Sequence, residues 1–202
     1  MTRIYIVRHG IGVYNTLHRI AGHTDCPLTD IGIRQAYAAK RYYKRIKLDC
    51  AYSSDLKRAL KTGQIITEDK GLKIHKSKKL RERTYGELDD LPSSLYREKG
   101  YFVNDIHEFG GENEWDVAQR AIKAVTAIAE KEAGKRILIT THEAFIVYLL
   151  WAIDYDAYKD LHDGDHVIGN CATTVLDYKN GKFRIIRVGD DSYIPEELRV
   201  RN

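Results

Sequence analysis

Hydrophobic and polar positions follow two spacings along this chain, and the two spacings alternate. Short apolar runs over 3–9, 49–54 and 136–141 predict buried strands, and 72–77 predicts a further one. The segments between the strands carry apolar residues at helical spacing, which predicts helices over 28–47, 54–71, 113–133 and 143–153; in 113–133 the helical positions are Trp115, Ala118, Ile122, Val125 and Ile128. This alternation indicates an α/β domain with a largely parallel sheet covered by helices.

Helix and turn boundaries have their own signals. Thr29 or Asp30 is the expected N-cap of the first long helix, and Gly71 and Gly134 are expected to end the next two. Asn180-Gly181, between apolar runs over 172–178 and 182–188, predicts a tight hairpin. We therefore expect two neighbouring antiparallel strands near the end of the chain.

The bulk composition is that of an ordinary globular protein. A chain of 202 residues with 43% hydrophobic and 31% charged residues predicts one domain, 1–202, with a substantial core. No apolar run approaches the roughly 20 residues that cross a bilayer, and the first residues lack the apolar core of a signal peptide. Three widely spaced cysteines, Cys26, Cys50 and Cys171, are expected as reduced thiols. We expect a cytoplasmic protein, monomeric or homodimeric, that does not bind membranes.

The charge balance also argues against nucleic acid as a partner. The net charge of +4 is mild and spread along the chain. The densest basic stretch, 73–83, holds no aromatic side chain for base stacking.

Reactive side chains follow the predicted parallel strands. Arg8 and His9 end the first strand, Arg58 lies just past the second, and His142 follows the strand over 136–141. Ligands of open α/β sheets bind beyond the carboxyl ends of the strands, so these four side chains are expected at one edge. Two guanidiniums without an obvious carboxylate partner would repel each other, which indicates that an anion belongs between them. Phosphate fits guanidinium geometry bidentately.

Two further residues and one imidazole suit phosphate chemistry. Gly10 permits close approach of the backbone, and Asn15 can donate an amide to a phosphate oxygen. A neutral imidazole facing phosphorus can act as a nucleophile and divide one difficult displacement into two easier ones.

Six motifs in order carry a resemblance to a known family. They are VRHG with Asn15, GHTDCPLTDIGIRQA (22–36), SSDLKRALKT (53–62), LRERTYGELD (80–89), GGENEWDVAQR (110–120) and THEAFI (141–146). Together they resemble the histidine phosphatase superfamily, phosphoglycerate mutase-like branch, over residues 3 to about 178. The resemblance implies a three-layer α/β/α sandwich with a short lid insertion at about 83–114.

The resemblance also implies roles for particular residues. His9 would become phosphorylated, while Arg8, Asn15, Gly22, Arg58, Glu82 and His142 would bind the substrate. Glu82 would act as acid and then base, since expelling an alkoxide requires a proton donor and water attack requires an acceptor. Such a site of fixed charges implies no metal and no cofactor.

The sequence departs from the family pattern at three positions. Ile11 and Gly12 stand where an acidic residue and then Thr or Ser usually follow Arg-His-Gly, and Glu143 replaces the usual Gly after the second His. Glu143 would lower the local affinity for anions if its side chain faced inward.

The expected lid is acidic. Residues 83–114 contain eight acids against three bases, a net charge of −5: Glu87, Asp89, Asp90, Glu98, Asp105, Glu108, Glu112 and Glu114 against Arg83, Arg97 and Lys99. We expect such a lid to disfavour polyanionic leaving groups. The predicted function is therefore hydrolysis of small phosphorylated metabolites through phosphohistidine.

Other functions fit parts of the sequence. A cofactor-dependent phosphoglycerate mutase and a non-catalytic phospho-ligand binder are the two alternatives for the same site. Asp163-Gly164-Asp165 imitates an aspartate-nucleophile phosphatase signature without the preceding apolar strand, and His162 with His166 could share a helix face for a metal. Asn170 is either a turn residue or a support for the site.

Overall fold

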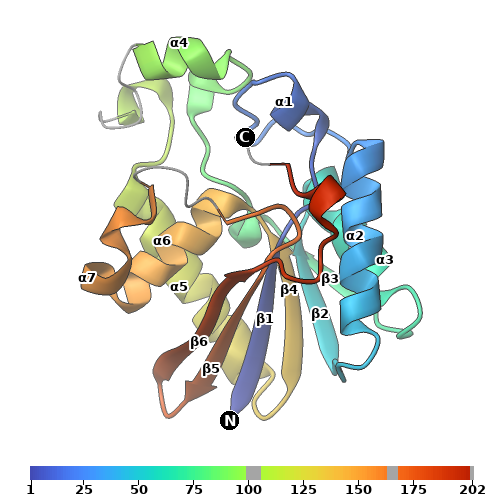
Figure 1. Cartoon of the computed structure of the whole chain (residues 1–202). Coiled ribbons are helices and arrows are strands. Elements are labelled where there is room, and N and C mark those ends of the chain that lie inside the picture. The colour runs from blue at the N-terminus through green and yellow to red at the C-terminus, as the bar shows by residue number, and fades with distance from the viewer. Residues whose placement is uncertain (99–105, 163–167, 201–202) are drawn as a thin grey trace.

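The protein, seen in a computed structural model that describes residues 1–98, 106–162 and 168–200, is built on a single sheet (Figure 1). Its strand order is β3-β2-β4-β1-β5-β6. The strands are β1 (Thr2–Arg8), β2 (Cys50–Ser54), β3 (Ile74–Ser77), β4 (Arg136–Thr141), β5 (Thr173–Lys179) and β6 (Lys182–Asp190). The first four pair in parallel, whereas β5 pairs antiparallel with both β1 and β6. The predicted, largely parallel sheet is confirmed.

Helices cover both faces of the sheet. Ile4 and Ile6 of β1 pack in one apolar core with helices α5 (Glu114–Lys131) and α6 (Glu143–Ile153). Val7 packs on the opposite face with α2 (Asp30–Tyr43) and α3 (Lys57–Thr67). Alternate side chains of a strand point to opposite faces, so one strand contributes to both cores. The result is a three-layer α/β/α sandwich.

Most predicted boundaries are confirmed, with differences at helix ends. Thr29 is the N-cap of α2, and its hydroxyl accepts from the Gly32 N–H over 3.0 Å. α3 ends at Thr67 and not at the predicted Gly71. A turn follows the helix, and Gly71, with φ +63°, lies at the end of that turn. Asn180 and Gly181 have φ values of +52° and +75° and form the predicted hairpin turn.

The predicted helical face of α5 is correct except at its start. Ala118, Val125 and Ile128 are buried, whereas Trp115 is exposed. Trp115 lies against Trp151 and Tyr155, with ring centroids 6.2 and 5.4 Å away, so it packs on neighbouring aromatic rings instead of entering the core.

Short elements lie beyond the carboxyl ends of the parallel strands. α1 (Val13–Thr16) and α4 (Ser93–Glu98) stand above that edge in Figure 1. The remaining short helices are α7 (Tyr155–Tyr158) and the 3-10 turns Lys78–Leu80, Gly86–Leu88, His107–Phe109, Lys159–His162 and Glu196–Leu198. Backbone hydrogen bonds between Ile20 and the residues Asp90 and Leu91 connect the expected lid segment to the loop after α1. Residues 99–105 of the expected lid lie outside the described part.

No described helix is long and apolar enough to span a membrane.

One close backbone approach fixes the end of β1. A Cβ built on Gly10 would lie 2.4 Å from the carbonyl oxygen of Gly32, in the first turn of α2. Only a residue without a side chain allows this contact, so Gly10 lets the residues after β1 pack directly against a helix start.

Candidate active site

Strand register brings the predicted residues to one edge of the sheet. Arg8 pairs with Thr141 across β1 and β4, and Ser53 pairs with Thr140 across β2 and β4. The residues that follow these pairs therefore emerge side by side. The N–H of His9 donates to the Thr141 carbonyl over 2.9 Å, and the rings of His9 and His142 lie 5.1 Å apart.

His9 is a buried, neutral imidazole. Its Nδ1 lies 2.7 Å from the carbonyl of Gly10, and a carbonyl only accepts, so Nδ1 carries the proton. The other nitrogen, Nε2, accepts from Arg58 Nε over 3.3 Å. Burial lowers the pKa of His9 well below its usual value, and the positive charges of Arg58 and Arg8 lower that pKa further. Nε2 is therefore unprotonated at neutral pH and directs its lone pair at the Arg58 N–H.

Arg58 is fixed in the first turn of α3 although it is almost completely buried. Its Nη1 and Nη2 donate to the carbonyls of Thr24 and Gly22, each over 2.9 Å. The hydroxyl of Thr62 donates to the Arg58 carbonyl and accepts from the Gly10 N–H, so it links this helix to the residue after His9. The guanidinium is thus preorganised beside the imidazole.

His142 is the N-cap of α6 and is also buried. Its Nε2 shares a hydrogen bond of 2.9 Å with the Ser54 hydroxyl. Burial lowers the pKa of His142 well below its usual value, with Arg58 and His9 acting in the same direction. The imidazole is therefore neutral at neutral pH.

Two buried polar atoms of the site have no protein partner. Within the described part of the chain, Arg8 Nε and His142 Nδ1 are the only buried side-chain nitrogen or oxygen atoms without a hydrogen bond. Native proteins rarely leave such groups unpaired, and exceptions need an explanation. Both atoms belong to residues predicted to hold a phosphoryl group, whose oxygens would satisfy them.

The expectation that neither arginine has a carboxylate partner is wrong for Arg8. Its Nη2 lies 2.9 Å from Glu143 Oε2, and its Nη1 donates to the Ile168 carbonyl. The sequence does not reveal this ion pair, because Glu143 begins the helix that follows His142, where parallel pairing of β4 with β1 brings it beside Arg8. Glu143 therefore faces inward, which is the orientation for which the sequence predicts a lower local affinity for anions.

Glu82, in the loop after β3, lies beside the N-terminus of α6. Its Oε1 accepts from the backbone N–H groups of Arg83 and Phe145, over 3.0 and 3.3 Å. Phe145 is in the first turn of α6, so Glu82 Oε1 satisfies one N–H group that has no partner within the helix. Glu82 is half-buried, with its carboxyl group close enough to Glu143 to raise the pKa of that residue.

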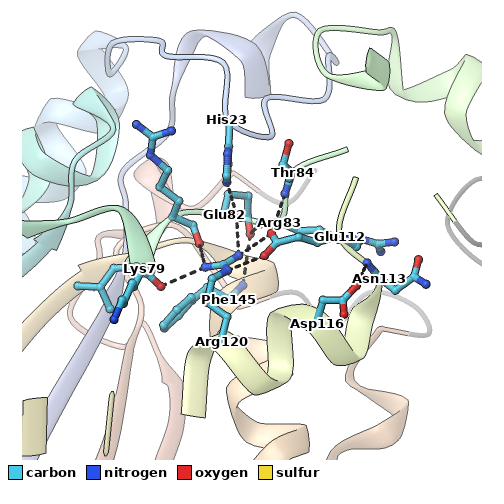
Figure 2. A network of polar contacts seen from close by, with 12 residues as sticks. His23, Lys79, Glu82, Arg83, Thr84, Glu112, Asn113, Asp116, Arg120 and Phe145 are labelled. Carbon is cyan, nitrogen blue, oxygen red and sulfur yellow. Dashed lines mark hydrogen bonds and ion pairs between the residues drawn. The ribbon is translucent and has the colours of Figure 1, made fainter. Parts of the chain in front are cut away.

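Figure 2 shows a polar network that fixes the backbone at Glu82. The Glu82 carbonyl accepts from His23 Nε2 over 2.9 Å and from Arg120 Nη2 over 3.1 Å. Arg120 also binds both carboxylate oxygens of Glu112, at 2.6 and 2.7 Å, and Glu112 accepts from the Thr84 N–H. The segment carrying Glu82 is therefore held from three sides.

Asn15 lies in the short helix α1, and Gly22 lies in a turn after it, where its carbonyl accepts from Arg58. Asn15 Oδ1 accepts from the Gly12 N–H over 2.9 Å. Gly22 has φ +43°, and a Cβ there would lie 1.7 Å from an oxygen of Asp89. Burial raises the pKa of Asp89, opposed by the N–H groups of His23 and Tyr85 that donate to it.

The departures at Ile11 and Gly12 have structural uses. Ile11 is buried, and its N–H donates to Gln35 Oε1 over 2.8 Å. A Cβ on Gly12 would lie 3.3 Å from Cys26 Sγ and 3.5 Å from Arg58 Cδ. A Cβ at residue 12 would therefore crowd the sulfur of Cys26 and make ordinary contact with Arg58.

The remaining sequence signals separate into three outcomes. Asn170 lies in a turn and its amide also donates to the His9 carbonyl over 3.0 Å, so both of its interpretations hold. Residues 163–167, including the aspartate signature and His166, lie outside the described residues. Among described residues no group of three His, Cys, Asp or Glu side chains could hold a metal, and all three cysteines are free and buried.

Sequence reasoning missed several residues that hold the site in place: Ser54, Thr62, His23, Glu112 and Arg120. Ser54 carried a usable signal, since it ends a strand beside the predicted histidine. The other four lie within the motifs quoted for the resemblance, but the motifs do not show which segments these side chains join.

Comparisons with known proteins agree with this geometry. The sequence profile of the histidine phosphatase superfamily (branch 1) matches residues 4–191. The probable phosphoglycerate mutase GpmB of Yersinia pestis (strain Pestoides F) is 33% identical over 190 residues, 89% of this chain and 86% of that protein. YhfR of Bacillus stearothermophilus superimposes with a TM-score of 0.86 at 27% identity, covering 96% of this chain and 100% of that one. A mycobacterial glucosyl-3-phosphoglycerate phosphatase in complex with VO3 superimposes with a TM-score of 0.81 at 25% identity, covering 93% and 98%.

Proposed function

Since the chain belongs to the histidine phosphatase superfamily, branch 1, we propose that it hydrolyses phosphomonoesters of small metabolites through a phosphohistidine at His9. The observation that carries the proposal is the pair of unpartnered buried atoms, Arg8 Nε and His142 Nδ1, which belong to the residue before the neutral imidazole of His9 and to the ring 5.1 Å from it. A tetrahedral anion offers acceptor oxygens to both atoms, and the guanidiniums of Arg8 and Arg58 offset its charge.

In the first step, His9 Nε2 attacks phosphorus. The bond between phosphorus and the ester oxygen breaks, and the carboxyl of Glu82 gives its proton to the leaving oxygen. In the second step, water attacks phosphorus while the Glu82 carboxylate accepts its proton. The bond between phosphorus and nitrogen breaks, and inorganic phosphate and neutral His9 remain. Arg58, already fixed by two carbonyls, stabilises charge on the transferring group without reorganising.

The lid supports hydrolysis of substrates with one phosphoryl group. Of its three bases, Arg83 is buried, donates to the Glu112 carbonyl over 2.7 Å and stacks on the Tyr85 ring at 5.0 Å. Its guanidinium is therefore already engaged. Since the segment carries a net charge of −5, a second phosphate or carboxylate on the leaving group would be disfavoured.

Phosphoglycerate mutase is the second candidate, since the relative from Yersinia pestis is named a probable mutase. The two functions differ in whether water or another acceptor receives the phosphoryl group. A panel of glycerol phosphate, nucleotide monophosphates, sugar phosphates and 3-phosphoglycerate, assayed with a chelator present, would separate them. Preference for 3-phosphoglycerate with mutase turnover would refute the hydrolase proposal.

The covalent step has a direct test. We expect hydrolysis of a chromogenic aryl phosphate, and rapid quenching at alkaline pH, where the bond between phosphorus and nitrogen is stable, should trap a phosphoenzyme whose modified residue is His9. The His9→Ala variant should lose both signals while retaining its fold by circular dichroism. A folded wild type that binds phosphate but neither hydrolyses nor becomes phosphorylated would instead identify a non-catalytic binder.

A further inference from the structure

Glu143 occupies one donor of an arginine that the proposed reaction assigns to phosphate. Its Oε2 lies 2.9 Å from Arg8 Nη2, and the two side chains are 28% and 8% exposed. The other terminal nitrogen of Arg8 is also engaged, because Nη1 donates to the Ile168 carbonyl. A phosphoryl oxygen that seeks Nη2 therefore meets a carboxylate already bound there.

Two charged groups decide how firmly Glu143 stays in place. Arg8, at the end of β1, attracts it, whereas Glu82, on the loop after β3, repels it. Burial raises the pKa of Glu143 first of all, Glu82 raises it further and Arg8 opposes both. Because Arg8 is the cation that favours the charged form, an anion that takes over Arg8 leaves a partly buried carboxylate facing two negative neighbours.

We propose that Glu143 is an internal competitor for phosphate: Arg8 Nε is open to a phosphoryl oxygen, but Glu143 must leave Nη2 before the group can bind Nε and Nη2 together, and it thereby weakens binding of substrate and product. This inference rests on the proposed function only in taking Arg8 as a phosphate ligand. An ion-paired hydrogen bond contributes about 1.5–3 kcal/mol, so its loss on binding corresponds to at least about tenfold in affinity.

The ion pair could instead be purely structural, with Glu143 holding Arg8 in a binding geometry. The two roles predict opposite signs. Removing a competitor strengthens anion binding, whereas removing a positioning group weakens it. The substitution Glu143→Gln keeps the shape of the side chain and removes only the charge, so the sign of its effect decides between them.

The experiment is titration of the full-length protein with tungstate, a tetrahedral dianion, by isothermal calorimetry. We expect Glu143→Gln to lower the Kd for tungstate about tenfold and to lower KM for an aryl phosphate in parallel. Glu143→Asp keeps the charge on a shorter arm and should stay nearer the wild type. Glu87→Gln removes an equal charge from an exposed lid position and should leave the Kd unchanged. Unfolding curves of each variant would confirm that the comparison is between folded proteins.

A Kd that rises or stays constant in Glu143→Gln would overturn the proposal. Equal tightening in Glu87→Gln would also overturn it, because the effect would then be long-range charge. The binding readout is independent of turnover: tighter tungstate binding by a protein without hydrolytic activity would support the competitor role while the proposed function fails. Loss of tungstate binding in Arg58→Ala locates the measured event at this site.

Discussion

Arg58 donates its Nε–H to Nε2 of His9 over 3.3 Å, so the nitrogen that would attack phosphorus is held against a fixed cation. The other two nitrogens of the guanidinium are occupied by the carbonyls of Gly22 and Thr24. This geometry needs a planar group with three separate donors, which an ammonium cannot reproduce. A positive charge at residue 58 without a guanidinium could not make these three hydrogen bonds.

Arg58→Lys keeps the charge and removes the planar set of three donors. We expect kcat/KM for an aryl phosphate to fall about 10²–10³-fold, the usual loss when one preorganised donor to a developing charge is removed. The measurement is steady-state hydrolysis, with Arg45→Lys on the exposed surface as the matched control. Wild-type kcat/KM in Arg58→Lys would show that the three donors of the guanidinium do not contribute to catalysis.

The two arginines also predict the titration of His9. Because burial and the neighbouring cations lower its pKa, His9 should stay neutral well below pH 6.5, with the proton on Nδ1. Nitrogen NMR of histidine-labelled protein would follow this imidazole, assigned by its loss in His9→Gln. Arg58→Ala removes one positive charge and should move the midpoint upward. A midpoint at or above 6.5 in the wild type would contradict the electrostatic argument.

The same shifts predict how stability depends on pH. His9 and His142 are neutral in the folded protein, while in the unfolded chain they take up protons as the pH falls through 6.5. The unfolded state then binds more protons, so the free energy of unfolding should decrease as pH falls below 6.5, by up to about 1.4 kcal/mol per pH unit for each histidine.

Urea unfolding between about pH 7.5 and 5.5 measures this slope. The double variant His9→Gln, His142→Gln removes both titrating groups and should flatten it by about 2.8 kcal/mol per pH unit at most. The same slope in the double variant would assign the acid sensitivity to other residues.

The fold was predictable because its signals are local. The run over 136–141 has a β-branched and apolar centre, Thr29 carries the side chain a helix start requires, and Asn180-Gly181 suits a turn with positive φ. Convergence of His9 and His142 was also predictable, since parallel strands present their carboxyl ends at one edge. The local sequence pattern and the rule for parallel strands were together sufficient to predict these elements and the meeting of the two histidines.

The partners of the site residues were not predictable in the same way. Whether Glu143 faces Arg8 or solvent depends on the entry angle of α6 and on strand register, which the sequence pattern leaves open. Arg120 donates to the carboxylate of Glu112, eight residues away, and to the carbonyl of Glu82, 38 residues away. Such contacts follow from tertiary packing, so they emerge only once the elements are placed.

Arg120 acts on the proposed acid through the backbone and not by direct contact with substrate, which makes it a positioning residue. Its guanidinium joins the Glu82 carbonyl to the carboxylate of Glu112, as Figure 2 shows. Arg120→Lys keeps the charge but cannot reach the carbonyls of Lys79 and Arg81, over 3.1 and 2.9 Å, and Glu82 together. We therefore expect Glu82 to be misplaced and kcat to fall by as much as about 10²-fold, with KM little changed.

The dependence on leaving group separates positioning of an acid from general loosening. A p-nitrophenolate leaves without protonation, whereas a glycerol alkoxide needs a proton from Glu82. Arg120→Lys should thus lose much more activity toward glycerol phosphate than toward p-nitrophenyl phosphate, and Glu82→Gln should show the same selectivity more strongly. Lys123→Arg, on the same helix, is the control for helix substitutions. Equal losses on both substrates in Arg120→Lys would mean that the network supports the fold without directing the proton.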